Sequence, residues 1–135
     1  MKPILQANEA FYLAFQEFDL DAMEGLWSGR PTDVCIHPGW SILRGWADIR
    51  ESWTRIFSNT TYMRFAPSDV EVHVVGQVAR VTCVENIYAI QEGHTLHSQV
   101  AGTNVFEHID GRWLLTLHHG SPLRVTRSAT PDADA

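Results

Sequence analysis

The spacing of apolar residues divides the chain into a helical first half and a strand-rich second half. In the first half apolar residues recur every three to four positions, which is the pattern of amphipathic helices with one buried face. Asp19 is a typical N-cap for the second helix, and Ser28-Gly29-Arg30-Pro31 ends that helix. The pattern predicts helices over residues 4–18, over 20–27 and from Arg44-Gly45 to Ser58, with a short strand over 33–37 and a brief return strand over 40–43.

The second half shows the alternation of apolar and polar residues that is typical of β-strands. Three turn signals interrupt it, at Val75-Gly76-Gln77, at Gln91-Glu92-Gly93 and at Asp110-Gly111. Four antiparallel strands are therefore predicted in succession from about Tyr62 to Pro122. Helices followed by an antiparallel sheet make the fold class α+β, with the three N-terminal helices folded over one face of the sheet.

The predicted strand over residues 78–90 is apolar on both faces. One alternating set holds Val81, Cys83, Glu85, Ile87 and Ala89, and the other holds Thr82, Val84, Asn86, Tyr88 and Ile90. The helices can cover only one face of the sheet, so a second copy of the chain is the simplest cover for the other. The sequence therefore predicts a homodimer, and strand parity assigns Glu85 to the face away from the helices.

Composition and charge limit the kinds of partner. Of the 135 residues 44% are hydrophobic and 19% are charged, which is typical of one globular domain, here expected over 1–123 with a disordered tail over 124–135. A net charge of −6 argues against nucleic acid and against an anionic membrane surface. No signal-peptide or membrane-spanning pattern is present, so Cys35 and Cys83 are interpreted as reduced core thiols of a cytoplasmic protein, with a disulfide between them left open.

Seven histidines are many for this length, and three of them are candidates for chemistry. His37 ends an apolar strand and precedes Pro38-Gly39-Trp40, so partial burial beside an indole would shift its pKa. His118 and His119 are neighbours on the last strand and point to opposite faces, so only one of them can face the helices. The others are expected at the surface, namely His73, His94, His97 and His108.

The register of the last hairpin decides which groups meet. A two-residue loop at Asp110-Gly111 would pair Asn104 with Leu117, whereas a three-residue loop with a bulge would pair Asn104 with Thr116. We favour the second register, because it gathers Asn104, Thr116 and His118 on the helix side. It assigns the bulkier Trp113, Leu115 and Leu117 to the interface side.

No motif for a cofactor or a metal is present, and we expect none. There is no glycine-rich phosphate loop, nucleophile elbow or Cys-x-x-Cys pair. A metal site made from His37 and His118 with Glu85 or Asp33 lacks a supporting His-x-His or His-x-x-x-His spacing. Large aromatic side chains over a curved sheet leave room for a cavity instead, and the residues expected to line it are Tyr12, Trp27, Trp40, Trp53, Asn86, Tyr88 and Asn104.

Four segments carry a resemblance to a known family: Asp19-Leu20-Asp21-Ala22, His37-Pro38-Gly39-Trp40, Arg44-Gly45-Trp46-Ala47-Asp48-Ile49 and Gly111-Arg112-Trp113. Over residues 3–123 the chain resembles the SnoaL-like branch of the nuclear-transport-factor-2-like superfamily, which is related to ketosteroid isomerase and polyketide cyclases. The resemblance implies a cone-shaped α+β barrel, usually dimeric, with a ligand cavity between the helices and the curved sheet.

The resemblance also implies where catalytic groups would stand. His37 takes the place of the general-base aspartate that precedes a proline in the isomerase pattern. The oxyanion-hole tyrosine falls at or beside Phe11, with Tyr12 the nearest phenol, and the protonated aspartate falls near Gly102. Because two of the three groups are missing, ketosteroid isomerisation is not expected, whereas dehydratases and cyclases of this fold use histidine as acid or base.

The resulting hypothesis is a protein that binds a small apolar or aromatic molecule. As an enzyme it would be a cofactor-independent isomerase, cyclase or dehydratase, with His37 as the proton-transfer group and His118 as its partner. The alternative is a non-enzymatic ligand-binding or dimerisation module, or an interaction subunit of a larger enzyme.

Overall fold

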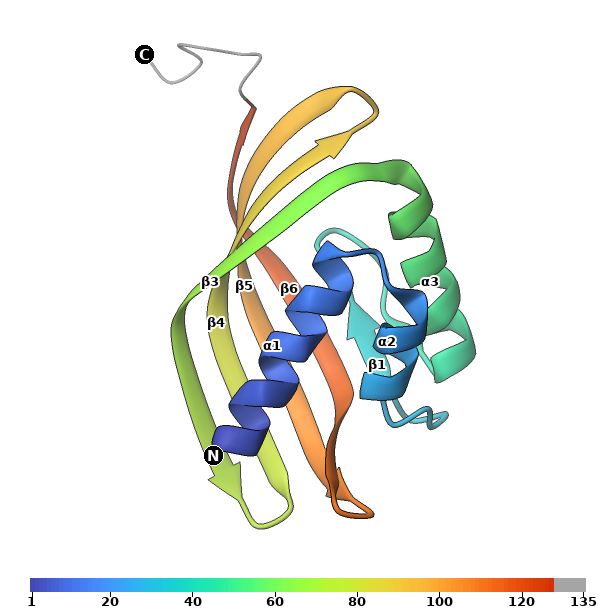
Figure 1. Ribbon diagram of the computed structural model, residues 1–135, viewed down its shortest axis with the longest axis vertical. Coiled ribbons are helices and arrows are strands. Elements are labelled where there is room, and N and C mark those ends of the chain that lie inside the picture. Colours follow the sequence, from blue (N-terminus) through green and yellow to red (C-terminus); the bar gives the residue numbers. More distant parts are fainter. Residues whose placement is uncertain (128–135) are drawn as a thin grey trace.

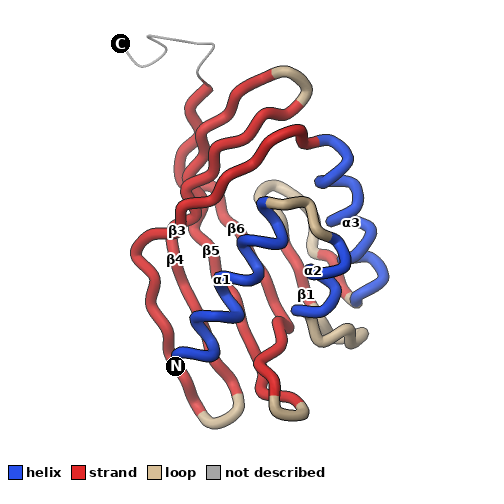
Figure 2. The backbone as a smooth tube through the Cα atoms, in the orientation of Figure 1, coloured by secondary structure: helices blue, strands red, loops and turns tan. Residues whose placement is uncertain are grey.

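Three helices lie on one side of a single curved sheet in the computed structural model, which describes residues 1–127 (Figures 1 and 2). The α+β class and the order of elements predicted from the sequence are confirmed. The elements are α1 (Lys2–Gln16), α2 (Leu20–Leu26), β1 (Val34–Ile36), β2 (Leu43–Arg44), α3 (Trp46–Asn59), β3 (Thr60–Val75), β4 (Val78–Gln91), β5 (His94–Ile109) and β6 (Arg112–Arg127).

The six strands form one open sheet in the order β2-β1-β6-β5-β4-β3. The long strands β3 to β6 pair antiparallel in succession, as their turn signals predicted. The sheet is nevertheless mixed, because β1 pairs parallel to β6, with Cys35 opposite His118. This pair joins the first half of the chain to the last strand, and it brings His37, just after β1, close to the middle of β6.

The hairpin between β5 and β6 has a register that neither sequence alternative gave. Its turn is the two-residue loop, since Ile109 pairs with Arg112, but a bulge at Thr116 shifts the strand beyond it. Asn104 therefore lies opposite His118 rather than opposite Thr116 or Leu117. The extra residue also reverses the alternation, so that Leu115, expected at the interface, is fully buried under the helices together with His118.

The parity assigned to β4 is wrong, and its two faces are exchanged. Glu85 is 2% exposed and reaches Tyr12 on α1, so its alternating set faces the helices. Asn86 and Tyr88 lie on the opposite, outer face of the sheet, where Tyr88 stacks on His97 at a ring separation of 4.4 Å. Because both sets are apolar, hydrophobicity alone could not distinguish the two faces.

The core lies between the helices and the inner face of the sheet, and aromatic rings from α1, α3 and β3 fill much of it. Phe11 and Phe15 of α1 pack edge-on against Trp53 of α3 at 5.8 and 4.6 Å, and Phe15 also contacts Phe65 of β3 at 4.4 Å. Edge-to-face packing of this kind adds about 0.5–1.5 kcal/mol per pair to the free energy gained by burial. Cys35 and Cys83 are buried within the core and are free.

The start of α2 follows local chemistry that the sequence predicted, whereas the end of β6 does not. The Asp19 carboxylate accepts a hydrogen bond from the Ala22 backbone N–H at 3.0 Å and so caps α2. At the other end of the chain β6 continues to Arg127, past residue 123 where we expected the domain to end. The rest of the expected disordered tail, residues 128–135, lies outside the described residues. Among the described residues no helix is long and apolar enough to span a membrane.

Candidate functional site

A cavity of about 380 Å³ opens between α3, the turn after β1 and the middle strands of the sheet. His37 and Trp40 lie on its wall beside the polar side chains of Gln91 and Ser98. The remaining wall is apolar and comes from Phe15, Pro38, Ile56, Met63, Ile87, Ala89, Leu96, Val100 and Pro122. An apolar wall with few polar groups is the usual character of a small-molecule site.

His37 is held in this wall by the turn that follows β1. The Trp40 backbone N–H donates to the His37 carbonyl at 2.9 Å, which closes the Pro38-Gly39 turn and sets the Trp40 ring 4.8 Å from the imidazole. On the other side the imidazole packs edge-on against Trp53 at 4.7 Å. The His37 side chain is therefore fixed between two indoles and is 2% exposed.

The hydrogen bonds of His37 determine which ring nitrogen is free. The Ser52 hydroxyl donates to the Ile49 carbonyl at 2.6 Å, so the Ser52 oxygen accepts from His37 Nε2, which lies 2.9 Å away. His37 Nδ1 then carries the lone pair, and its described contact is the Cys35 sulfur at 3.9 Å. Burial lowers the His37 pKa to about 4, because the apolar surroundings disfavour the imidazolium. At neutral pH His37 is thus an unprotonated base with a fixed ring.

His118 belongs to a buried hydrogen-bond network on the inner face of the sheet. Its Nδ1 lies 2.6 Å from the Asn104 side-chain oxygen, and the Asn104 amide nitrogen donates to Asn8 at 2.8 Å and to the Tyr12 hydroxyl at 3.1 Å. The amide orientation makes His118 Nδ1 the donor. Tyr12 in turn donates to the Glu85 carboxylate at 2.5 Å, so the network runs from His118 to Glu85.

Glu85 ends this network inside the core. Burial raises its pKa to about 7, which the hydrogen bond from Tyr12 opposes, and burial together with the nearby Glu85 carboxyl raises the pKa of Tyr12. Gly102 on the neighbouring strand makes room for this carboxyl group, since a Cβ there would lie 2.9 Å from Glu85 Cδ. The family resemblance implied an acid near Gly102, and the structure fills that space with the acid from β4.

The two candidate histidines are close to one another but differ in their access to the cavity. Their ring centres are 6.4 Å apart, and His118 is packed against Phe11 at 4.9 Å. His118 does not line the cavity that contains His37. Burial and the neighbouring His37 and His119 lower the His118 pKa to about 3. His118 therefore stands as a neutral, fully buried group behind the cavity wall.

Of the other residues expected to line the cavity, the structure places only Trp40 on its wall. Trp53 is buried behind this wall. Tyr12 and Asn104 are in the polar network, whereas Trp27 packs on Trp46 at 5.9 Å. The structure places Asn86 and Tyr88 on the outer face. It adds Asn8 and Ser52, which the sequence did not predict, and Glu85, which parity had assigned to the other face.

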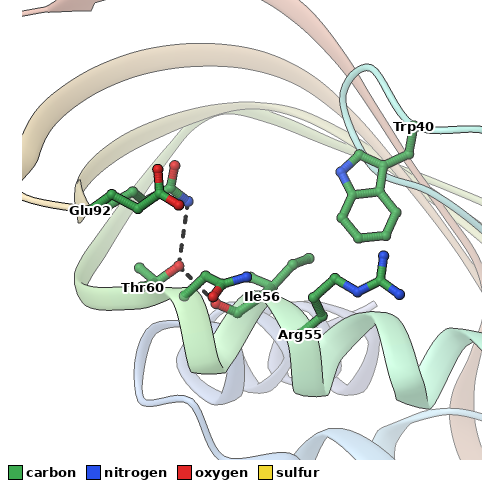
Figure 3. A pocket seen from close by; sticks show the side chains of 7 residues that line it. Trp40, Arg55, Ile56, Thr60 and Glu92 are labelled. Atoms are coloured by element: carbon green, nitrogen blue, oxygen red, sulfur yellow. Dashed lines mark hydrogen bonds between the residues drawn. The ribbon is translucent and has the colours of Figure 1, made fainter.

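A second, more polar hollow of about 270 Å³ adjoins the cavity (Figure 3). It is lined by Trp40, Arg55, Ile56, Asn59, Thr60, Gln91 and Glu92, of which Trp40, Ile56 and Gln91 also line the cavity. Neither space shows a metal-binding arrangement: within residues 1–127 no three His, Cys, Asp or Glu side chains converge as ligands.

Residues 4–125 match the family model described as a SnoaL-like domain. A solved structure from Streptomyces avermitilis, a candidate dehydratase of the nuclear-transport-factor-2-like family, is 35% identical. The match covers 91% of this chain and 95% of that one with a TM-score of 0.85. A candidate calcium/calmodulin-dependent protein kinase type II association domain from Thiobacillus denitrificans is 28% identical, over 87% and 93% of the chains, with a TM-score of 0.78.

Among curated proteins the chain is similar to the F-box protein SKIP8 of Arabidopsis thaliana, with 27% identity over 124 residues. The match covers 92% of this chain and 51% of that protein, so the chain spans about half the length of this relative.

Proposed function

The chain belongs to the SnoaL-like domain family, and from this premise we propose that its cavity binds a small apolar or aromatic molecule on which His37 transfers a proton. One observation carries the proposal. His37 is the titratable group on the wall of an otherwise mainly apolar cavity, and Ser52 fixes its ring with Nδ1 unprotonated. Such a group accepts a proton without a cofactor.

Dehydration is the reaction class that this geometry fits best. His37 Nδ1 takes the proton from a carbon next to a carbonyl, a carbon–carbon double bond forms, and the neighbouring carbon–oxygen bond breaks. The imidazolium then gives its proton to the departing hydroxyl, and water leaves. Because a base with a pKa of about 4 is weak, the carbon acid has to be activated by the carbonyl. The 35% identical relative, a candidate dehydratase, supports the same class.

The test separates binding from turnover. Thermal unfolding of the wild type is measured with ketones, enones, aromatic acids and β-hydroxy carbonyl compounds, and each stabilising β-hydroxy compound is followed by NMR for loss of water. We expect the His37→Gln variant to be stabilised by the same compounds but to lose turnover by about 10²- to 10⁴-fold.

The matched control is His119→Gln, because His119 is exposed on the outer face of the same sheet. This variant should keep both binding and turnover. Undiminished turnover by His37→Gln would remove His37 from the reaction. If no compound stabilises the wild type, the binding proposal fails as well.

The second candidate function is a non-enzymatic association module. It is favoured by the similarity to a candidate kinase association domain and by the outer face of the sheet, which the helices leave uncovered. Ligand binding without turnover of any compound would favour this reading.

A homodimer and a cytoplasmic location complete the proposal. The outer face carries Val84 of β4, Ala101 and Val105 of β5 and Leu117 of β6 on adjacent strands, and a second copy of the chain would cover them. The two free, buried cysteines are the basis for the reducing compartment.

A further inference from the structure

We propose that the molecule bound in the cavity carries a carboxylate, and that Arg55 holds this group in the adjoining polar hollow. The inference rests on the proposed function, since it names the class of ligand that the same site takes. It starts from the three residues shared by the two spaces, Trp40, Ile56 and Gln91. A ligand longer than one ring can therefore occupy the cavity and place one end in the hollow.

The two spaces differ in chemical character. The cavity wall is mostly aliphatic and aromatic, whereas the hollow presents a guanidinium, two side-chain amides, a hydroxyl and a carboxylate. An apolar body gains free energy in the first space, and a charged head keeps its solvation and finds partners in the second. The pair of spaces thus selects a molecule with an apolar body and one polar end.

Arg55 supplies the positive charge at this end. Its guanidinium carbon lies 5.8 Å from the centre of the Trp40 ring, and Figure 3 shows the two side chains facing each other across the hollow. Asn59 follows one helical turn later on α3 and lines the same hollow. The ion pair of Arg55 with Glu51, at 3.8 Å, is exposed and contributes little to stability. The guanidinium can therefore bind a ligand carboxylate instead of Glu51.

The opposite wall defines where the charge can sit. In Figure 3 Glu92 lies over Thr60, away from Arg55 and Trp40. Its carboxylate repels a second anion there, so the negative charge of the ligand belongs at the Arg55 side. On the Glu92 side of the hollow the Gln91 amide donates to Thr60 Oγ1 at 3.4 Å, and the Thr60 hydroxyl donates to the Ile56 carbonyl at 2.8 Å. The Gln91 oxygen, without a partner among the described residues, is left to accept from a ligand hydroxyl.

The test compares 3-phenylpropanoate with its uncharged amide, 3-phenylpropanamide, as probes of equal shape. Dissociation constants are measured by NMR titration for the wild type, for Arg55→Gln and for Arg50→Gln. The last variant is the matched control, because Arg50 lies on the same helix, is similarly exposed and pairs with Glu24 at 2.9 Å, outside the hollow.

We expect the wild type to bind the carboxylate about three- to tenfold more tightly than the amide, despite the net charge of −6. Arg55→Gln should abolish this preference while leaving the amide affinity unchanged, and Arg50→Gln should keep it. Added salt should reduce the preference, since the site is exposed.

Equal binding of both probes to the wild type, or a preference that survives Arg55→Gln, would overturn the inference and leave the proposed cavity function standing. Binding of neither probe would count against an aromatic ligand in the cavity, and the inference would fail with that proposal.

Discussion

Glu85 carries a carboxyl group inside the core, where it is 2% exposed and accepts a hydrogen bond from Tyr12. Burying an ionised carboxylate costs several kcal/mol, and the protein reduces this cost by raising the pKa of Glu85 to about 7. The ordinary pKa of a glutamate, which applies in the unfolded chain, is 4.5. Between pH 4.5 and about pH 7 the folded protein therefore holds a proton on Glu85 that the unfolded chain has released. The stability that this bound proton contributes is fully present below pH 4.5 and is lost as the pH rises through about 7.

Replacing Glu85 by glutamine should remove this pH dependence. From about pH 5 to about pH 8 the wild type should lose about 3 kcal/mol more of its unfolding free energy than Glu85→Gln loses. Urea denaturation of both proteins at the two pH values measures it. His37 and His118, whose lowered pKa values make stability fall with acid, are present in both proteins and cancel in the comparison. Parallel pH curves would show that Glu85 is ionised throughout.

The position of His37 was predicted better than the position of Glu85. His37 lies directly after its strand as expected, because Pro38-Gly39 fixes where that strand ends, which is a local signal. Glu85 was misplaced because both alternating sets of β4 are apolar. Arg80 belongs to the set of Tyr88 and is exposed in the structure, so a charged residue near the start of the strand was the signal that could have assigned the faces.

At the scale of elements, β5 and β6 show how a strand adapts to the core around it. The position of the Asp110-Gly111 turn was predicted from its sequence, but the loop has two residues rather than the three that we favoured. The bulge at Thr116 was not predicted, because its cause is tertiary: it turns both Leu115 and His118 toward the helices, which strict alternation cannot do. The parallel pair of β1 and β6 is likewise set by contacts distant in sequence.

A glycine on β5 tests how tightly these strands enclose the buried acid. Gly102→Ala should destabilise the protein by about 1–3 kcal/mol, because the added Cβ would lie 2.9 Å from Glu85 Cδ. Gly25→Ala is the control: that position on α2 has open space around it and should gain about 0.5–1 kcal/mol from better helix propensity. Thermal and urea unfolding of both variants measure the difference, and equal effects would mean that the Glu85 side chain moves aside freely.

At the scale of the whole molecule, the helices leave one face of the sheet without a cover (Figure 1). The centre of this face is apolar, and Leu117 of β6 lies there opposite Val105 of β5. A standard interface buries about 800 Å² on each partner, which is about a tenth of the 7817 Å² surface of this chain. Four strands of 14 to 16 residues, spaced about 4.8 Å apart and rising about 3.3 Å per residue, give the outer face an area of that order.

The homodimer proposal can therefore be tested at a single position. Leu117→Glu places a charge at the centre of the outer face and should convert a wild-type dimer into a monomer in sedimentation experiments, since an unpaired charge cannot be buried in an interface without a large cost. Val75→Glu adds the same charge at the end of β3, remote from Leu117 in the sheet, where Val75 is 66% exposed, and should leave the dimer intact. Thermal unfolding confirms that both variants fold. A monomeric wild type, or a Leu117→Glu variant that stays dimeric, would mean that this face is not the contact between copies.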